Sequence, residues 1–323
     1  PKKVYKNIWV WSPLVIPGAS NRLILFINRI FFSIGLRITF LVIDFHYEWL
    51  WSYNPLITRL LNTKYFSKTI YHAVDAIQEQ PNMPKQIIET EERKLCKLAD
   101  HVFATSPQIK RTLSPYSRSI TYESNCCDYK HFAKSINISQ DKLPFDLLNI
   151  PQPRIGFIGA ISSYKLDFVL ISNLALLHPE WNFVFIGPTS EGESYTDLAS
   201  IKERKNVYLL GYKAYNELPY YCAGFDIAWL PLQINAYTQS MFPMKFFEYL
   251  AAGLPVVATG IDSLSAFSQE AFLCDSSIES HVLAFQSVLA GQIPPLENRL
   301  RLAKNHTYEL RTLRMIDEIS KMN

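Results

Sequence analysis

The residues best able to do chemistry in this sequence are a lysine and a glutamate three positions apart, Lys245 and Glu248. They lie in the stretch 242–259, where Pro243 stands in the expected first turn of a helix and Gly253 at its end. Amides at a helix N-terminus can bind an anion, and Lys245 would add a full charge for a diphosphate. Glu248 shares a face with Lys245 and could accept both hydroxyls of a ribose. The pattern therefore favours a sugar nucleotide over free phosphate, although a surface ion pair would use the same spacing.

Six short apolar runs in the second half of the chain predict buried parallel strands, most of them separated by helical stretches. The runs are 154–161, 182–188, 206–212, 225–232, 254–259 and 271–275. This alternation predicts a doubly wound parallel sheet, whose ligands bind outside the carboxyl ends of the strands. Residues 297–321 follow as one long amphipathic helix with six basic side chains, which we expect to cover one face of the assembly.

The first half of the chain also alternates strand and helix patterns. We expect strands at 8–16, 38–44, 69–75, 101–106 and 119–122, and helices after residue 20, around 89–99 and from residue 107. The polar stretch 128–153 contains three prolines and suits an interdomain linker. We therefore expect an N-terminal domain at 1–150 and a C-terminal domain at 151–323.

Composition excludes several classes of protein. With 323 residues, 48% of them hydrophobic, the chain is long enough for two folded domains and too apolar to be mainly disordered. A net charge of +3 suits anionic ligands but falls short of the basic footprint of a nucleic-acid binder, so no nucleic-acid partner is expected. The five cysteines lack metal-ligand spacing and are expected to be reduced thiols in the cytoplasm. The start at Pro1 indicates a chain that has been truncated at its beginning.

The apolar run 23–45 is the one transmembrane candidate in the sequence. Asn28, Arg29 and Arg37 interrupt it and Gly35 splits it, so we predict a helix to about residue 36 followed by a buried strand. Arg22, Arg29 and Arg37 among apolar side chains also suggest contact with an anionic membrane. A half-buried surface helix is the alternative interpretation.

The run PMKFFEYLAAGLPVVAT, residues 243–259, resembles the donor-binding signature of glycosyltransferase family 4, retaining enzymes of the group 1 type. The segments IGFIGAI, NFVFIGP, LLGYKAYNELPYYCAGFDIAWLPL and SNCCDYKHF are similar to other landmarks of that family, so the resemblance covers most of residues 100–323. It implies the GT-B fold, an α/β architecture of two Rossmann-like, doubly wound parallel-sheet domains that face a cleft, with the C-terminal helix packing back across.

The resemblance also implies a set of donor-binding residues. Glu248 occupies the place of the second glutamate in a Glu-x7-Glu pair, which binds the ribose, whereas Ser240 replaces the first glutamate. Either the backbone of Ser240, Met241 and Phe242 takes over its contacts with the donor sugar, or the donor differs. The implied donor contacts are Gly159, Lys165, Gly187, Tyr212, Lys213, Ser240, Met241, Phe242, Lys245 and Glu248.

Other candidates have simple structural alternatives. His72 and Asp75 stand at the carboxyl side of a predicted strand and are the predicted catalytic residues, as acceptor-orienting groups or a base. A hydrogen bond at the strand end would explain both without catalysis. Lys165 could be a solvated lysine in a loop as well as a ligand of the phosphate. Turn geometry alone could explain Gly159 and Gly187.

The sequence thus predicts a glycosyltransferase that moves a sugar from a nucleoside diphosphate sugar to a glycan or lipid-linked acceptor in bacterial surface polysaccharide synthesis. The resemblance implies retention of anomeric configuration, and without an Asp-x-Asp motif in the sequence no metal cofactor is expected. The expected location is the cytoplasm or the inner face of the membrane, with a peripheral membrane contact. Two alternatives stay open: a sugar-nucleotide epimerase of the same fold, and a non-catalytic sugar-nucleotide-binding module.

Overall fold

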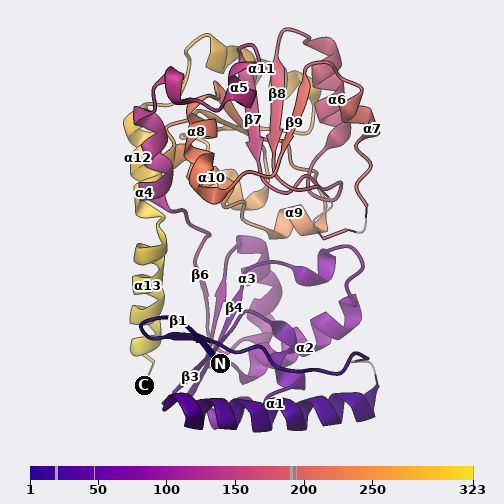
Figure 1. The fold of residues 1–323 in the computed structure, drawn as a ribbon, viewed down its shortest axis with the longest axis vertical. Coiled ribbons are helices and arrows are strands. Elements are labelled where there is room, and N and C mark those ends of the chain that lie inside the picture. Colours follow the sequence, from indigo (N-terminus) through magenta and orange to yellow (C-terminus); the bar gives the residue numbers. More distant parts are fainter. Residues whose placement is uncertain (19–20, 47, 190–191, 194, 323) are drawn as a thin grey trace. The chain divides into compact units, whose positions relative to one another are not determined.

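The computed structural model describes residues 1–18, 21–46, 48–189, 192–193 and 195–322. The chain forms two compact units, each containing a parallel β-sheet (Figure 1). The first unit comprises residues 1–74, 83–104 and 109–122. The second comprises residues 75–82, 105–108 and 123–323.

The segment predicted as a linker belongs to the second unit. Within it, α4 (Tyr129–Phe132) contacts both α8 (Leu218–Ala223) and α10 (Lys245–Ala251). The side chains of Phe132 and Leu147 are buried in the core of this unit. The chain therefore divides near residue 123 and not near 150, because these short helices bury apolar side chains although their sequence lacks a clear period.

The second unit contains a six-stranded parallel sheet in the order β12-β11-β10-β7-β8-β9. Its strands are β7 (Arg154–Ile158), β8 (Asn182–Ile186), β9 (Val207–Gly211), β10 (Ile227–Leu230), β11 (Val256–Thr259) and β12 (Phe272–Cys274). All six apolar runs predicted in this half are strands. The strand order reverses between β7 and β10, and such a reversal marks the ligand crevice of open α/β sheets.

Two groups of helices pack in this unit. The first group is α6 (Phe168–Leu177), α7 (Ala199–Lys202) and α11 (Ile278–Leu289), and the second is α4, α8, α10 and α12 (Leu296–Asn305). The remaining short helices are α5 (Phe145–Leu148) and α9 (Ala236–Ser240). Every residue of β7, β8, β10 and β11 is buried, as expected for parallel strands covered on both faces.

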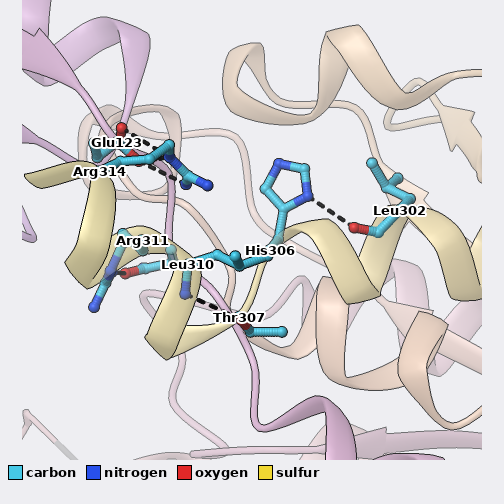
Figure 2. A network of polar contacts seen from close by, with 8 residues as sticks. Glu123, Leu302, His306, Thr307, Leu310, Arg311 and Arg314 are labelled. Atoms are coloured by element: carbon cyan, nitrogen blue, oxygen red, sulfur yellow. Dashed lines mark hydrogen bonds and ion pairs between the residues drawn. The ribbon is translucent and has the colours of Figure 1, made fainter.

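The predicted terminal helix is two helices, α12 and α13 (Tyr308–Ser320), so the prediction of a single helix over 297–321 was wrong. The His306 carbonyl accepts a hydrogen bond from the Cys127 amide at 2.9 Å, which removes it from the helical pattern. Thr307 then caps α13 by accepting a bond from the Leu310 amide at 3.3 Å (Figure 2). Arg314 of α13 forms an ion pair with Glu123 at 2.8 Å (Figure 2). This contact holds α13 to the start of the segment 123–323.

The first unit contains a four-stranded parallel sheet whose strands follow sequence order. They are β3 (Trp49–Ser52), β4 (Lys68–Ala73), β5 (His101–Ala104) and β6 (Ile120–Tyr122). α2 (Lys85–Leu98) connects β4 to β5, and α3 (Pro107–Leu113) precedes β6. The last three strands match the predicted runs, whereas β3 was not predicted.

The first 44 residues differ most from the prediction. β1 (Lys2–Tyr5) and β2 (Ile8–Val10) form an antiparallel pair, and α1 (Arg22–Ile43) is one continuous helix. The predicted strand at 38–44 is therefore wrong, because Gly35 does not break the helix. A side chain at Gly35 would meet the Trp11 ring at 2.8 Å, so this glycine serves close packing against the preceding segment.

Trp229, at the centre of the second sheet, tests how the core of this unit is stabilised. Its indole is fully buried, with ring centroids of Phe183 and Phe285 both 5.4 Å away. Trp229→Ala should lower the free energy of unfolding by about 3–5 kcal/mol, measured by denaturant unfolding, because it leaves a cavity between sheet and helix. Leu283→Ala on the exposed side of α11 should change it by less than about 0.5 kcal/mol. Equal effects of the two substitutions would contradict this assignment of the core.

Candidate functional site

A cavity of about 460 Å³ lies at the carboxyl ends of β7, β8 and β10, at the reversal of strand order. Loops after the strands line it, together with the residues that lead into α10. Its walls are mainly apolar, with Phe157, Leu166 and Leu218 among them. Three ammonium-bearing side chains also line it: Lys165, Lys213 and Lys245. Apolar walls with a few cations are typical of a site for a ligand that is part ring system and part anion.

Two glycines shape the cavity by letting two loops approach each other. A side chain at Gly187 would lie 2.0 Å from the Gly159 carbonyl oxygen, so no other residue fits without moving the backbone. Both glycines have positive φ, 157° at Gly159 and 143° at Gly187, where an L side chain is strained. The Gly159 amide donates to the Ile186 carbonyl at 2.8 Å. Both residues line the cavity, so their contact sets its boundary.

The helix α10 is fixed against β7 by a buried hydroxyl. The Ile158 amide donates a hydrogen bond to the Tyr249 hydroxyl oxygen at 2.7 Å. Because Ile158 ends β7 and Tyr249 lies in α10, this bond sets the distance between the two elements whose ends line the cavity. Lys245, the first residue of α10, is thereby held at the cavity.

Lys245 and Glu248 form a close ion pair. The Lys245 Nζ lies 2.5 Å from the Glu248 Oε2, and the Glu248 side chain is only 2% exposed. Burial raises the pKa of Glu248, and the positive charge of Lys245 opposes that shift. The ammonium lines the cavity, whereas Glu248 is not among the described residues that do so. An ion pair is therefore present, but it is not the surface pair named as the alternative, because the Glu248 carboxylate is buried behind the ammonium.

Aromatic side chains surround this pair, and the sequence did not single them out. The Lys245 Nζ lies 5.7 Å from the centroid of the Phe132 ring. The His131 ring stacks on Tyr215 with centroids 4.4 Å apart, and its Nε2 lies 2.8 Å from the Tyr215 carbonyl oxygen. Burial, followed by the negative charge of Glu248, raises the pKa of the Tyr215 hydroxyl. His131 and Phe132 fall in the landmark SNCCDYKHF, which was the available signal for them.

Lys213 is held by a second carboxylate. Its Nζ lies 2.6 Å from the Asp146 Oδ2, and the Tyr221 hydroxyl donates to the Asp146 Oδ1 at 2.9 Å. The hydrogen bond to Asp146 raises the pKa of Lys213, so the ammonium stays charged. The neighbouring Tyr212 is exposed and lines the same cavity, where its ring is available for stacking.

The two predicted catalytic residues lie in different units. Asp75 belongs to the second unit, where burial raises its pKa to about 6 and the positive charge of Lys165 opposes the shift. His72 belongs to the first unit, in β4, and its buried ring packs against those of Trp51, Tyr53 and Phe103. The structure thus associates Asp75 with a lysine of the cavity and places His72 within an aromatic cluster.

Most of the predicted donor contacts are brought together. The residues that line the cavity are Gly159, Lys165, Gly187, Tyr212, Lys213, Met241 and Lys245. Ser240, Phe242 and Glu248 are not among its lining residues. The Ser240 carbonyl accepts a bond from the Ser106 hydroxyl at 2.7 Å, and the Phe242 carbonyl accepts one from the Asn125 amide at 2.8 Å. These carbonyls already have protein partners, so of the Ser240–Phe242 backbone segment only Met241 reaches the cavity.

Comparison with known proteins places this site in a family context. Residues 152–290 match the family model described as glycosyl transferases group 1. The chain is 30% identical over 187 residues to TuaH of Bacillus subtilis, a protein named as a teichuronic acid biosynthesis glycosyltransferase. The second unit resembles the group 1 glycosyltransferases. The aligned region covers 56% of this chain and 45% of TuaH, so the chain spans less than half the length of that relative.

Solved structures show the same fold. Sucrose-phosphate synthase from Thermosynechococcus elongatus superposes with a TM-score of 0.69 at 16% identity, over 93% of this chain and 79% of that one. Anabaena HepE, solved in complex with UDP, gives 0.66 at 16% identity, over 90% of this chain and 82% of that one. The chain therefore has the fold of GT-B glycosyltransferases, as the sequence resemblance implied.

Asp75 makes stability depend on pH in a defined direction. Its folded pKa of about 6 exceeds that of an unfolded aspartate, about 3.9, so the folded state retains the proton to higher pH. The stability from this proton is complete below about pH 4 and is lost as the pH rises through about 6. Relative to Asp75→Asn, the unfolding free energy of the wild type should fall by roughly 2–3 kcal/mol between pH 4 and pH 7.5. A constant difference in denaturant titrations across this range would refute the raised pKa.

Proposed function

We propose that this protein is a glycosyltransferase that binds a nucleoside diphosphate sugar in the cavity of the second unit. The observation that carries the proposal is the cavity itself, which combines apolar walls with Lys165, Lys213 and Lys245 at the switch point of a doubly wound sheet. A nucleobase and ribose need apolar and stacking surfaces, while a diphosphate needs cations. The sugar would pass to a glycan or lipid-linked acceptor.

A UDP-sugar is the donor we propose. HepE structures in complex with UDP and with UDP-glucose support this choice, since their fold matches that of the present chain. The name of TuaH, which refers to teichuronic acid biosynthesis, supports an acceptor in the assembly of a bacterial surface polysaccharide. The reaction would take place in the cytoplasm, at the inner face of the membrane.

The lysines would stabilise the leaving group. As the bond between the sugar C1 and the diphosphate oxygen breaks, negative charge develops on the terminal phosphate. Lys165 and Lys245 line the cavity and would stabilise that charge. Reliance on lysine rather than a divalent cation, and retention of configuration, are parts of the same proposal, and both come from the family resemblance.

The Lys245–Glu248 pair would open when the donor binds. The carboxylate lies 2.5 Å from an ammonium that lines the cavity, so a change of side-chain torsions could bring it to the ligand. Lys245 would then turn to the diphosphate, and the ribose hydroxyls would donate to Glu248 in place of the ammonium. Without such a partner the buried carboxylate would lose the group that stabilises its charge.

Asp75 is the residue we propose as the proton-transferring group. A carboxyl with a pKa of about 6 can exchange a proton near neutral pH, which is what a general base for an acceptor hydroxyl requires. His72, buried among aromatic rings, would contribute packing to β4 in place of its predicted catalytic role.

Calorimetric titration with UDP tests the cavity. Lys245→Ala should weaken UDP binding about 10- to 100-fold, because a charge-assisted hydrogen bond to phosphate is lost, and should weaken UMP binding less. Lys304→Ala removes an exposed lysine on α12 and serves as the matched control, with no change expected. Absence of UDP binding by the wild type, or equal effects of the two substitutions, would refute the assignment of the cavity.

The role of Glu248 is separable by ligand chemistry. If the ribose hydroxyls donate to its carboxylate, Glu248→Gln should weaken UDP at least about tenfold more than 2′,3′-dideoxyuridine diphosphate, measured by the same calorimetry. If Glu248 only positions Lys245, the substitution should weaken both ligands equally. Equal losses would therefore remove the ribose contact from the proposal while leaving the cavity as the donor site.

A further inference from the structure

The helix α1 has its polar and apolar faces in inverted positions. Its buried side chains are Asn28 and Thr39, which are 3% and 6% exposed. Leu23 and Leu41, by contrast, are 66% and 83% exposed. A helix on a water-facing surface normally buries its apolar stripe and exposes its polar one. α1 is also, within the described ranges, the one helix long and apolar enough to cross a membrane by length and composition.

The orientation of α1 is fixed by specific contacts. The Ile16 amide donates to the Asn28 Oδ1 at 2.8 Å, and the Asn28 Nδ2 donates to the Ile16 carbonyl at 2.9 Å. Gly35 lies against the Trp11 ring, and the rings of Trp11 and Phe32 are 5.2 Å apart. One face of α1 is therefore bound to the segment that precedes it in the first unit (Figure 1). The exposure of the apolar side chains follows from these contacts.

The exposed face carries an ordered pattern. At 3.6 residues per turn, Leu23, Ile30, Ile34 and Leu41 fall on one side of α1. The other large exposed apolar side chains of the helix are Phe26, Phe31, Ile38 and Val42. Arg22 and Arg29 fall at one edge of this face, and Arg37, about 80° further round the helix, falls among its apolar side chains. An apolar face with arginines on one side of it is the pattern of helices that lie in a membrane interface.

We propose that α1 lies in the plane of an anionic membrane surface. Its apolar face would contact the acyl chains near the headgroups, and the three arginines would contact lipid phosphates. Charge complementarity selects this occupant, because α1 carries three arginines, and no acidic residue occurs in the sequence from Arg22 to Ile43. A helix that spans the membrane would instead place Arg29 and Arg37 in the hydrocarbon. It would also break the two hydrogen bonds between the Asn28 side chain and the Ile16 backbone.

A cavity beside α1 extends the same surface. It measures about 560 Å³ and is lined by residues of the helix and of the segment after β3, including Arg37, Phe40, Leu41 and Leu61. The Arg37 guanidinium lies 5.7 Å from the centroid of the Tyr65 ring. The charged groups of this lining are the Arg37 guanidinium and the Asp44 carboxylate, and the other walls are mainly apolar. A phospholipid would place an acyl chain against the apolar walls and its phosphate at Arg37.

Vesicle flotation of the full chain tests the proposal. The protein should float with vesicles of phosphatidylcholine and phosphatidylglycerol and bind pure phosphatidylcholine at least about tenfold less. Leu41→Glu should lower partitioning about tenfold or more, because it places a charge among acyl chains. Leu283→Glu, at another exposed leucine, on α11 of the second unit, should leave it unchanged. Replacing Arg22, Arg29 and Arg37 together by Gln should lower binding to the anionic vesicles about a hundredfold.

Two controls separate this proposal from the donor site. Circular dichroism and UDP calorimetry should give wild-type values for Leu41→Glu, because Leu41 is exposed and does not line the cavity of the second unit. Failure of the wild type to float, or flotation of Leu41→Glu equal to that of the wild type, overturns the proposal. So does a dimer in light scattering that Leu41→Glu dissociates, since a second copy would then cover the face. UDP binding is measured without vesicles and is decided independently.

Discussion

The reversal of strand order between β7 and β10 is the constraint on which the candidate site depends. Crossovers between parallel strands are right-handed, so a sheet that grows in opposite directions from two neighbouring strands sends its loops to opposite faces. A gap remains at the carboxyl ends of the strands that no crossover can cover. Gly159 and Gly187 lie at the edge of this gap, where their backbones approach each other too closely for a side chain at Gly187. The cavity follows from topology, and the loop sequences only refine its chemistry.

Charge balance is the second property that unites the site. Lys213 pairs with Asp146 and Lys245 pairs with Glu248, while the charge of Lys165 acts on Asp75. An ammonium beside apolar walls loses part of its hydration, and a nearby carboxylate offsets that loss. A diphosphate bound as proposed would have to compete with these carboxylates, so its affinity would depend on how readily each pair opens. The ion pair of Glu248 with Lys245 leaves no preformed contact for a ribose. It is compatible with a site in which the ligand replaces Lys245 as the partner of Glu248.

The sequence predicted the second unit much better than the first. Its six strands are apolar runs bounded by turn residues, so local pattern and tertiary burial agree. Seven of the ten donor contacts implied by the family resemblance line the cavity, because they stand in loops after strands or at the start of α10. The aromatic neighbours His131 and Tyr215 could not be predicted from spacing, since they are brought together from distant segments. The division of the chain near residue 123 was missed for the same reason, because contacts made far along the sequence decide it.

The wrong prediction for residues 38–44 has a physical explanation that bears on α1 as a whole. An apolar run indicates side chains that leave water, and a short run fits a buried strand as well as part of a helix. In the structure these side chains extend a helix and face outward, with Ile38, Leu41 and Val42 exposed. Hydropathy reports the preference for a nonaqueous medium but not whether protein or lipid supplies it. In α1 the polar side chains of Asn28 and Thr39 are buried, while the arginines and many of the apolar side chains are exposed. The proposed contact with an anionic bilayer surface would account for both the buried polar and the exposed apolar side chains.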